Sequence, residues 1–465
     1  MSLTEKLAGF IVETDFDDLP NEVVKKTKLC LLDFLGCVYG GSRDRSGRIL
    51  LDLVRKIDGK REASVIAVGD KLPCTYAALV NGTMGHALEF DDLHTKGGAH
   101  PGVTIIPAAL ALAERERSSG EELITSIVIG YEVNVRVGLP VSFASEHKLE
   151  RAHGVHVSSL MGTFGAAAAA AKLLKLDKER VANALRICAL SPVSPFEATV
   201  GGGMVKDMYG GWPAHTGLFA ALLAKLGFTG PDKVLEGIPL GIYNIVLRRD
   251  FDHQQLLDGL KDEWAILSTT FKPYACCRFS HSTIDALLKI ILRTPIDPKE
   301  VKEITIRSHA RAYHIGAITE PKDLVAARFS LPFIVARVIM KRGGVDVDDI
   351  TEDTIKEKEA LELAKKVRCI HDSYLDELAL QGYRVANVKI ALEDGRTYEG
   401  RVDIAKGDPR RPMSEEELIG KFKRLASMLI DQHQVEQVIH KTLSLETIKD
   451  IRGYVRGLLP KHKIK

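Results

Sequence analysis

Residues 158–176 read SSLMGTFGAAAAAAKLLKL, and this alanine-rich stretch has the composition of a buried helix. Its small side chains allow neighbouring helix axes to approach closely, which favours a position inside a helical bundle. Lys172 and Lys175 interrupt the run, and no stretch of the chain reaches the roughly 18 apolar residues that a membrane-spanning helix needs. The segment therefore predicts an all-helical domain in a protein without a transmembrane helix.

Further helical patterns extend from this segment in both directions, separated by short breaks that contain Gly or Pro. They cover residues 21–39, 47–57, 74–89, 107–117, 121–138, 179–189 and 213–227. Such a series of helices, with no alternating segment between them, predicts an all-α domain.

The pattern changes near residue 270. Residues 301–308 alternate apolar and polar side chains like a half-buried strand, and residues 386–402 form a second alternating run. Asp394-Gly395 interrupts the second run with a hairpin signal. A helix is expected over 322–342, between the two runs. This part of the chain predicts a small α+β domain.

Helical patterns resume at Ser414, which begins a capping box with Glu417. The expected fold is therefore mainly α with an inserted α+β domain, and a chain of 465 residues is long enough for two cores. We expect residues 1–268 and 406–465 to form a large all-helical domain, and residues 269–405 to form a smaller lid domain.

Composition limits the partners of the protein. The chain carries 64 basic and 62 acidic side chains, for a net charge of +2, so nothing global favours nucleic acid or an anionic membrane. Its seven cysteines are odd in number and lack the spacing of a zinc or iron–sulfur site, which predicts free thiols in a reducing compartment. The N-terminus has no signal-peptide pattern. We therefore expect a cytoplasmic protein.

Residues 86–101, HALEFDDLHTKGGAHP, are rich in groups that transfer protons. They include His86, Glu89, Asp91, Asp92, His94 and His100. Three interpretations are open. The residues could bind a metal, although their spacing matches no zinc motif; they could be helix caps and a solvated loop; or the carboxylates could orient a histidine for proton transfer. We favour the third.

Two other segments suit an anionic ligand. Residues 151–159, RAHGVHVSS, place His153 and His156 at an expected helix N-terminus, where free N–H groups favour an anion. Residues 201–211, GGGMVKDMYGG, lack the GK[ST] of a phosphate loop but contain Lys206 among glycines and apolar side chains. A partly buried lysine has a lowered pKa and is suited to proton transfer.

A last polar segment, residues 271–281, reads FKPYACCRFSH at the entrance to the expected second domain. It contains Lys272, Arg278 and His281, and Arg is suited to binding a carboxylate. A polar hinge is the simpler explanation of these residues. The adjacent Cys276 and Cys277 are expected to be structural because most free cysteines are buried and inert.

Together these segments resemble the MmgE/PrpD family, which includes 2-methylcitrate dehydratase, cis-aconitate decarboxylase and iminodisuccinate epimerase. The resemblance rests on ordered stretches along nearly the whole chain, among them NGTMGHALEFDD, HPGVTIIPAALALAE, MVKDMYGGWPAHTGLFAALLAKLGFTGP and KPYACCRFSHSTIDA. It implies a large helical domain built from both termini, an inserted lid domain and a homodimer.

The resemblance also implies a site between the domains. Its residues map onto Asp91, Asp92, His100, His156, Lys206 and Lys272. Glu89 and Leu93 depart from the aspartate and threonine of decarboxylase-like members, and the loop before His100 is one residue longer. These departures count against decarboxylation.

We therefore expect a lyase without metal or cofactor that removes a proton next to a carboxylate of a small polycarboxylic acid. One histidine, His156 or His100, would take the proton, oriented by Asp91 or Asp92. Cationic side chains would stabilise the charge that develops, at about 3 kcal/mol per donor. The expected catalytic residues are His100, His156, Lys206, Lys272 and Asp91, and the expected substrate contacts are Asp92, Glu89, Leu93, Arg278 and His281.

The favoured reaction is the dehydration of 2-methylcitrate or a similar hydroxy acid, as in propionate catabolism. The alternatives are epimerisation or decarboxylation of a related polycarboxylate, a metal-dependent lyase, and a helical binding module without activity.

Overall fold

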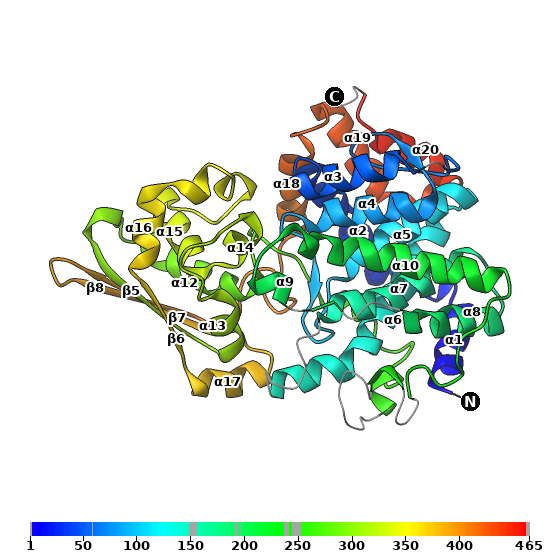
Figure 1. Ribbon diagram of the computed structural model, residues 1–465, viewed down its shortest axis with the longest axis horizontal. Helices are drawn as coiled ribbons and strands as arrows, with labels where there is room; N and C mark the ends of the chain where they lie inside the picture. The colour runs from blue at the N-terminus through cyan, green and yellow to red at the C-terminus, as the bar shows by residue number, and fades with distance from the viewer. Residues whose placement is uncertain are drawn as a thin grey trace.

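The computed structural model describes residues 2–57, 59–147, 156–190, 194–195, 197–236, 241–243 and 253–461. The protein is mainly helical, with a smaller α+β unit beside a larger helical body, as the sequence predicted (Figure 1). Both termini lie on the helical body. Across the described segments, no helix is both long and apolar enough to cross a membrane.

The helical body contains segments from both ends of the chain. Its N-terminal helices are α1 (Leu3–Glu13), α2 (Asn21–Gly41), α3 (Arg45–Arg55), α4 (Cys74–His86), α5 (Pro101–Glu116), α6 (Gly120–His147), α7 (Val157–Leu173), α8 (Lys178–Ile187), α9 (Glu197–Val200) and α10 (Met208–Lys225). Its C-terminal helices are α18 (Glu415–Ala426), α19 (Gln432–Leu443) and α20 (Ile451–Leu458). One hydrophobic core joins both sets.

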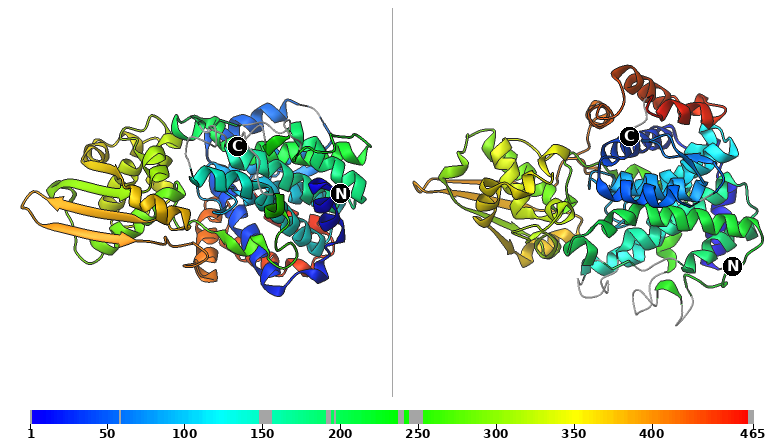
Figure 2. Two further views of the ribbon diagram at one scale, coloured as in Figure 1. Left: turned by 90° about the horizontal axis from the view of Figure 1, so that it is seen from below. Right: turned by 45° about the horizontal axis from the view of Figure 1, so that its top comes forward.

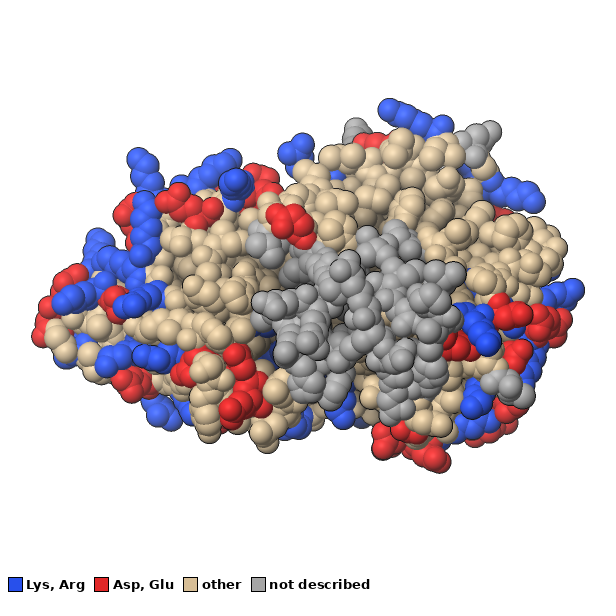
Figure 3. Space-filling view, turned by 60° about the horizontal axis from the view of Figure 1, so that its bottom comes forward, with Lys and Arg blue, Asp and Glu red and all other residues tan. Residues whose placement is uncertain are grey.

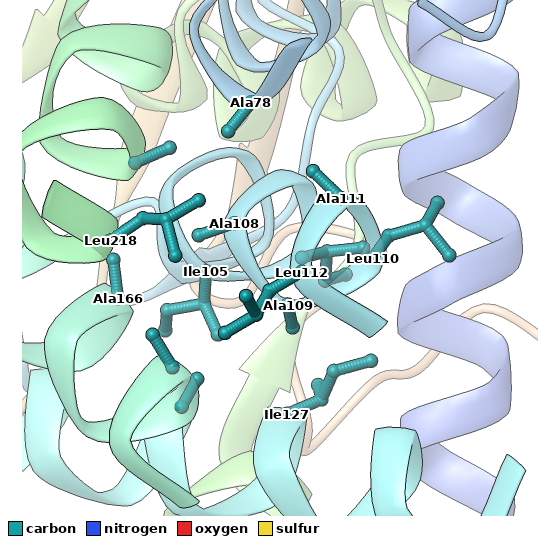
Figure 4. Close-up of a cluster of buried hydrophobic side chains, with 14 of the residues drawn as sticks. Ala78, Ile105, Ala108, Ala109, Leu110, Ala111, Leu112, Ile127, Ala166 and Leu218 are labelled. Carbon is teal, nitrogen blue, oxygen red and sulfur yellow. The ribbon is translucent and has the colours of Figure 1, made fainter. Parts of the chain in front are cut away.

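The alanine-rich helix α7 is buried at the centre of this body. Figure 4 shows small and branched side chains of five helices meeting there, including Ala78, Ile105, Ile127, Ala166 and Leu218. A Cβ atom on Gly165 of α7 would lie 2.7 Å from the carbonyl oxygen of Gly130 on α6, so this crossing requires glycine. The predicted role of the segment in helix packing is confirmed.

Two predicted helix starts are wrong, and proline explains both. The helices expected at 107 and 213 begin at Pro101 and Met208, and Pro107 and Pro213 lie inside them. A proline is most easily accommodated in the first turn of a helix, so Pro107 and Pro213 favour a start that the structure does not have there. The helix expected over 322–342 is divided at Ser330 into α14 (Leu324–Phe329) and α15 (Leu331–Lys341).

The α+β unit is built on a four-stranded sheet in the order β6-β5-β7-β8. Its strands are β5 (Val301–Ser308), β6 (Val367–His371), β7 (Ala386–Leu392) and β8 (Thr397–Val402), and its other helices are α12 (His281–Ile291), α13 (Ala310–Gly316), α16 (Lys358–Lys365) and α17 (Ser373–Leu380). The hairpin predicted at Asp394-Gly395 is confirmed by the antiparallel β7–β8 pair. Strand β6, parallel to β5, was not predicted.

Two chain segments connect the units, and a hydrogen bond from the backbone N of Phe271 to the carbonyl of Gly407 (3.2 Å) joins them. The sheet extends away from the helical body in both views of Figure 2. We propose the domain division 1–268 with 406–465, and 269–405, because the α+β unit has its own hydrophobic core. Acidic and basic side chains are interspersed on the face shown in Figure 3, in line with the small net charge.

Candidate active site

The site is organised by the turn that follows α4. Glu89 adopts the left-handed backbone conformation (φ 52°), which costs a non-glycine residue on the order of 1–3 kcal/mol. Two buried lysines hold the carbonyl groups of this turn: Lys272 Nζ donates to Glu89 (2.9 Å) and Lys421 Nζ donates to Phe90 (2.6 Å). The backbone strain is thus maintained by contacts from distant parts of the chain.

Asp91 joins two histidines. Its Oδ2 lies 3.0 Å from His86 Nδ1 and 2.8 Å from His100 Nδ1, and the carbonyl oxygen of Asp92 lies 2.9 Å from the same His100 nitrogen. Because both neighbours of His100 Nδ1 are acceptors, this nitrogen carries a proton. The sequence left open whether Asp91 or Asp92 orients a histidine, and this geometry favours Asp91.

Electrostatics fix the charge states around Asp91. Burial acts to raise its pKa, but the neighbouring His86, His100 and Lys272 outweigh burial and hold the pKa of Asp91 well below its usual range. Burial lowers the pKa of His86 to about 3. Asp91 is therefore a carboxylate beside a neutral His86.

Asp92 faces away from the site. Its Oδ2 accepts a hydrogen bond from the Tyr131 hydroxyl (2.6 Å), and its Oδ1 accepts one from the backbone N of Gly102 in the first turn of α5 (2.9 Å). Burial raises the pKa of Asp92 to about 7. Its side chain fixes the start of α5, and this position gives the predicted substrate contact of Asp92 no support.

A short antiparallel pair brings the second lysine to the site. Strand β3 (Leu93–His94) pairs with β4 (Thr269–Thr270), which precedes Lys272. Lys272 Nζ then lies 2.9 Å from Glu89 Oε2, and Lys206 forms an ion pair with Glu89 Oε1. All three residues are at most 4% exposed, with the lysines nearly inaccessible. One carboxylate between two ammonium groups leaves an excess of positive charge for an anion.

Lys206 belongs to a short 3-10 helix, η3 (Met204–Asp207), that follows Gly202 and Gly203. Burial lowers the pKa of Lys206 well below its ordinary value, and the charge of Lys272 acts in the same direction. Both glycines have positive φ (80° and 97°), a conformation that other residues rarely adopt. The glycine-rich segment therefore gives Lys206 its position, as expected of a flexible backbone around a buried cation.

A cavity between the helical body and the α+β unit contains most of the candidate residues. From the body it is lined by Glu89, Leu93, His94, Thr95, Gly98, Ala99, His100, His156, Ser158, Thr199 and Lys206; from the α+β unit it is lined by Cys277, Arg278, Phe279, Arg311, Ile315, Phe329 and Arg384. Glu89 is the one acidic side chain in this lining, which consists of described residues alone.

Two long helices begin at the cavity, and each has a histidine as its N-cap residue. His100 precedes α5 and His156 precedes α7. The ring of His156 lies 4.6 Å from that of Tyr209, and burial lowers the pKa of His156 well below its ordinary value. His156 is therefore neutral at pH 7. His153, the other histidine expected there, lies outside the described residues.

His281 and Arg278 differ from expectation. His281 is fully buried outside the cavity lining, with Nε2 3.2 Å from the carbonyl oxygen of Cys276 and Nδ1 3.1 Å from Arg278 Nη1. This position gives its predicted substrate contact no support. Arg278 does line the cavity, but it also donates to the carbonyl groups of Lys406 (2.6 Å) and Ala405 (3.2 Å), which connects it to the second inter-unit segment.

His86, Asp91 and His100 are also the one group of three potential metal ligands found within the described ranges, with ligand atoms all within 4.8 Å of one another. The two nitrogens concerned already share Asp91 Oδ2 as a hydrogen-bond acceptor. His86 Nε2 and Asp91 Oδ1 of this group are buried without a hydrogen-bond partner among the described residues. Chemistry without a metal stays our prediction.

Sequence comparisons identify relatives over the whole chain. Models of the MmgE/PrpD N-terminal and C-terminal domains match residues 5–254 and 274–445. The cis-aconitate decarboxylase-like protein oryM of Aspergillus oryzae is 28% identical over 472 residues, covering 97% of this chain and 96% of the relative. The cis-aconitate decarboxylase of Aspergillus terreus is 26% identical (94% and 91% covered), and that of Homo sapiens is 28% identical (97% and 93% covered).

Proposed function

The chain belongs to the MmgE/PrpD family, and from this premise we propose that it is a cofactor-independent lyase acting on a small polycarboxylic acid. The cavity carries the proposal, because its lining combines histidines with Lys206 and three arginines around a single carboxylate. The N-termini of α5 and α7 add their partial positive charge at His100 and His156. Such a cavity favours a ligand with several negative charges.

Decarboxylation of a cis-aconitate-like acid has more support than the dehydration expected from the sequence, because the similar full-length proteins are named as decarboxylases. In this reaction the bond between the methylene carbon and its carboxylate breaks, and its electron pair forms a double bond to the central carbon. The original double bond takes up a proton at the alkene carbon that is not the central one, and carbon dioxide leaves.

The geometry supports His100 as the general acid in this step. The Asp91 carboxylate holds Nδ1–H and stabilises the imidazolium, and Nε2–H donates the proton to the carbon. Lys206 and Lys272 provide positive charge opposite the substrate carboxylates, with Glu89 fixing both ammonium groups. We also propose that the α+β unit closes over the bound acid and excludes water, since it supplies one wall of the cavity.

One observation favours a second candidate reaction. His156 is neutral and lines the cavity, which suits a base that removes a proton next to a carboxylate. Dehydration of a 2-methylcitrate-like acid and epimerisation both need such a base, whereas decarboxylation needs an acid. Glu89 and Leu93, the two departures from decarboxylase-like members, point in the same direction.

A reaction panel in deuterated water tests these assignments. Purified protein is incubated with cis-aconitate, 2-methylcitrate or iminodisuccinate, before and after exhaustive chelation, and products are followed by NMR and carbon dioxide release. Carbon dioxide with one deuterium per product from cis-aconitate supports decarboxylation. An alkene from 2-methylcitrate supports dehydration, and deuterium in recovered substrate supports epimerisation. Loss of activity on chelation contradicts a metal-independent lyase, and no turnover of any acid contradicts the proposal.

We further propose a homodimer in the cytoplasm. Exposed apolar side chains on and after α10 support self-association: Trp212, Phe219, Leu226 and Phe228. All seven cysteines are free, which agrees with a reducing compartment. Light scattering of the purified chain tests the dimer directly.

A further inference from the structure

Two hydroxyl groups in the cavity lining have a hydrogen that no described residue accepts. Ser158 and Thr199 both line the cavity from the helical body, and each residue is 2% exposed. Thr199 Oγ1 has no hydrogen-bond partner within the part of the chain that the structure describes. Ser158 Oγ accepts a hydrogen bond from the backbone N of His100 (3.2 Å), and its own hydrogen has no acceptor among the described residues. Both hydroxyls can therefore donate to a ligand.

The position of these hydroxyls distinguishes them from other unpaired ones. A buried hydroxyl without a partner has lost its hydrogen bonds to water and gained none, so most buried polar groups in folded proteins do have a partner. Thr283 Oγ1, on α12, is also buried without a partner among the described residues, but Thr283 does not line the cavity. Only a hydroxyl of the lining, such as that of Thr199, can obtain its partner from a ligand in the cavity.

The segments that carry Ser158 and Thr199 are joined to each other. Helix α9, which contains Thr199, lies between the two units and packs against η3 of the body and against α13 and α14 of the α+β unit (Figure 1). The backbone N of His156 donates to the carbonyl of Ser194 (2.8 Å), which connects the start of α7 to the chain before α9. Ser158 lies in the first turn of α7. Both hydroxyls are therefore held at the boundary between the units.

The ligand group that suits these hydroxyls is a negatively charged acceptor. Glu89, the single acid of the lining, is already paired with Lys206 and Lys272, so the charge left over in the described lining is positive. A carboxylate accepts several hydrogen bonds and donates none. Hydrogen bonds to a charged acceptor are also stronger than those between neutral groups. Neutral donors beside fixed cations thus complete the contacts of a carboxylate.

We propose that Ser158 and Thr199 are substrate-binding residues, whose hydroxyl groups donate hydrogen bonds to carboxylate oxygens of the bound acid. The proposal rests on the proposed function for the class of ligand, a small polycarboxylic acid. Because Ser158 Oγ contacts the backbone of His100, the carboxylate that it binds lies beside the proposed general acid. The two hydroxyls thereby hold the acid in one orientation relative to His100, which is the positioning that proton transfer to carbon requires.

A saturated tricarboxylate tests these contacts without any reaction. Tricarballylate is titrated calorimetrically into the full-length protein and its variants. Thr199→Val keeps the shape of the side chain and loses the hydroxyl, so it is expected to bind about 10- to 100-fold more weakly than the wild type, the usual range for a hydrogen bond to a charged group. Thr199→Ser keeps the hydroxyl and should bind within about threefold of the wild type. Thr283→Val removes an equally buried hydroxyl outside the lining, and as the matched control it should not change the affinity.

Urea unfolding without ligand separates binding from folding. Thr199→Val should be no less stable than the wild type, because its Oγ1 has no partner among the described residues to lose. Ser158→Ala removes the acceptor of the His100 backbone N as well, so it should lose stability together with about tenfold in tricarballylate affinity.

The outcomes separate this proposal from the proposed function. Wild-type affinity in Thr199→Val overturns the contact alone, and so does an equal loss in Thr199→Val and Thr283→Val, which shows an indirect effect of removing a buried hydroxyl. Absence of tricarballylate binding in the wild type contradicts the proposed class of ligand, and the contact is overturned with it. If Thr199→Val alone loses affinity and Thr199→Ser retains it, the contact stands even when no acid of the reaction panel is turned over.

Discussion

The two walls of the cavity are built in opposite ways. On the helical side, Glu89, Asp91 and Lys206 are at most 4% exposed. Glu89 pairs with Lys206 and with the fully buried Lys272 of the first inter-unit segment, and Asp91 contacts His86 and His100. In the α+β unit, Arg311 and Arg384 are half-buried and their common neighbour is an aromatic ring. Burial and paired charges set the protonation states in the helical wall, whereas the arginines of the α+β wall keep a permanent positive charge.

From this difference we expect catalysis and substrate selection to depend on different walls of the cavity. Proton transfer needs a pKa matched to its task, and burial with paired charges is the usual way to shift one. Recognition of a carboxylate needs only a charged donor at the right distance. Changes to the charged groups of the helical wall should therefore alter turnover or stability, and changes in the α+β wall should alter affinity.

The strongest test of this separation is His100→Ala. Removing the proposed general acid should lower kcat by about 10²- to 10⁴-fold and leave tricarballylate affinity within about threefold of the wild type. Initial rates with the acid identified by the reaction panel, and calorimetry, measure the two effects. His433→Asn, at an exposed histidine on α19, is the control with full activity. Parallel loss of turnover and affinity would show that His100 does not separate the two functions.

The second test breaks the charge arrangement of the helical wall. Glu89→Gln leaves two buried ammonium groups without their carboxylate, and the loss of one partner from a buried ion pair costs about 3–5 kcal/mol. Urea unfolding should show this loss, whereas Arg401→Gln, at an exposed arginine on β8, should unfold like the wild type. Tricarballylate should stabilise Glu89→Gln more than the wild type, because its carboxylates can replace the missing charge. Unchanged stability of Glu89→Gln would mean that the wall does not depend on this carboxylate.

The fold could be predicted because its elements have strong local patterns. Alternation marked β5 and the β7–β8 hairpin, and alanine and glycine marked the close packing of α7. Strand β6 was missed because residues 367–371 are short and only partly buried, so no clear alternation is present. The two misplaced helix starts arose from prolines that the buried bundle accommodates inside a helix.

The site could be predicted only where its residues are clustered in the sequence. Asp91 and His100 lie in one dense polar segment, but the pairing of β3 with β4 that brings Lys272 to Glu89 has no sequence signal. The choice between Asp91 and Asp92 as the partner of a histidine also depends on the fold. Arg311 and Arg384 were missed because they are isolated arginines that only the tertiary structure brings together.

A smaller effect is expected where the two walls touch. Asp323, before α14, accepts hydrogen bonds from the backbone N of Gly203 (2.9 Å) and of Ala326 (2.8 Å). The ring centroid of Phe329, on the same helix, lies 5.5 Å from Lys206 Nζ. Asp323→Ala should lower kcat/KM about tenfold, the equivalent of one lost hydrogen bond of about 1.4 kcal/mol. Asp297→Ala removes a similar cap far from the cavity and serves as the control. Equal rates in the two variants would contradict a role for Asp323 in placing Lys206.

The smallest effect concerns acid and a buried histidine of the helical wall. Burial lowers the pKa of His94 to about 4, and its Nδ1 accepts a hydrogen bond from the backbone N of Gly97 (2.9 Å), so the folded protein needs the neutral ring. Between pH 6.5 and pH 4 the unfolded chain binds a proton at this histidine and the folded chain does not, so stability falls as pH falls. Each such histidine lowers the free energy of unfolding by about 1.4 kcal/mol per pH unit, and no arginine titrates in this range. Asn supplies an oxygen at the place of Nδ1 without a ring that titrates. Between pH 6.5 and pH 5.5 the free energy of unfolding of His94→Asn in urea should therefore fall by about 1 kcal/mol less than that of the wild type. Identical pH dependence of the two proteins would show that His94 is not kept neutral by the fold, and that the helical wall does not fix its protonation state.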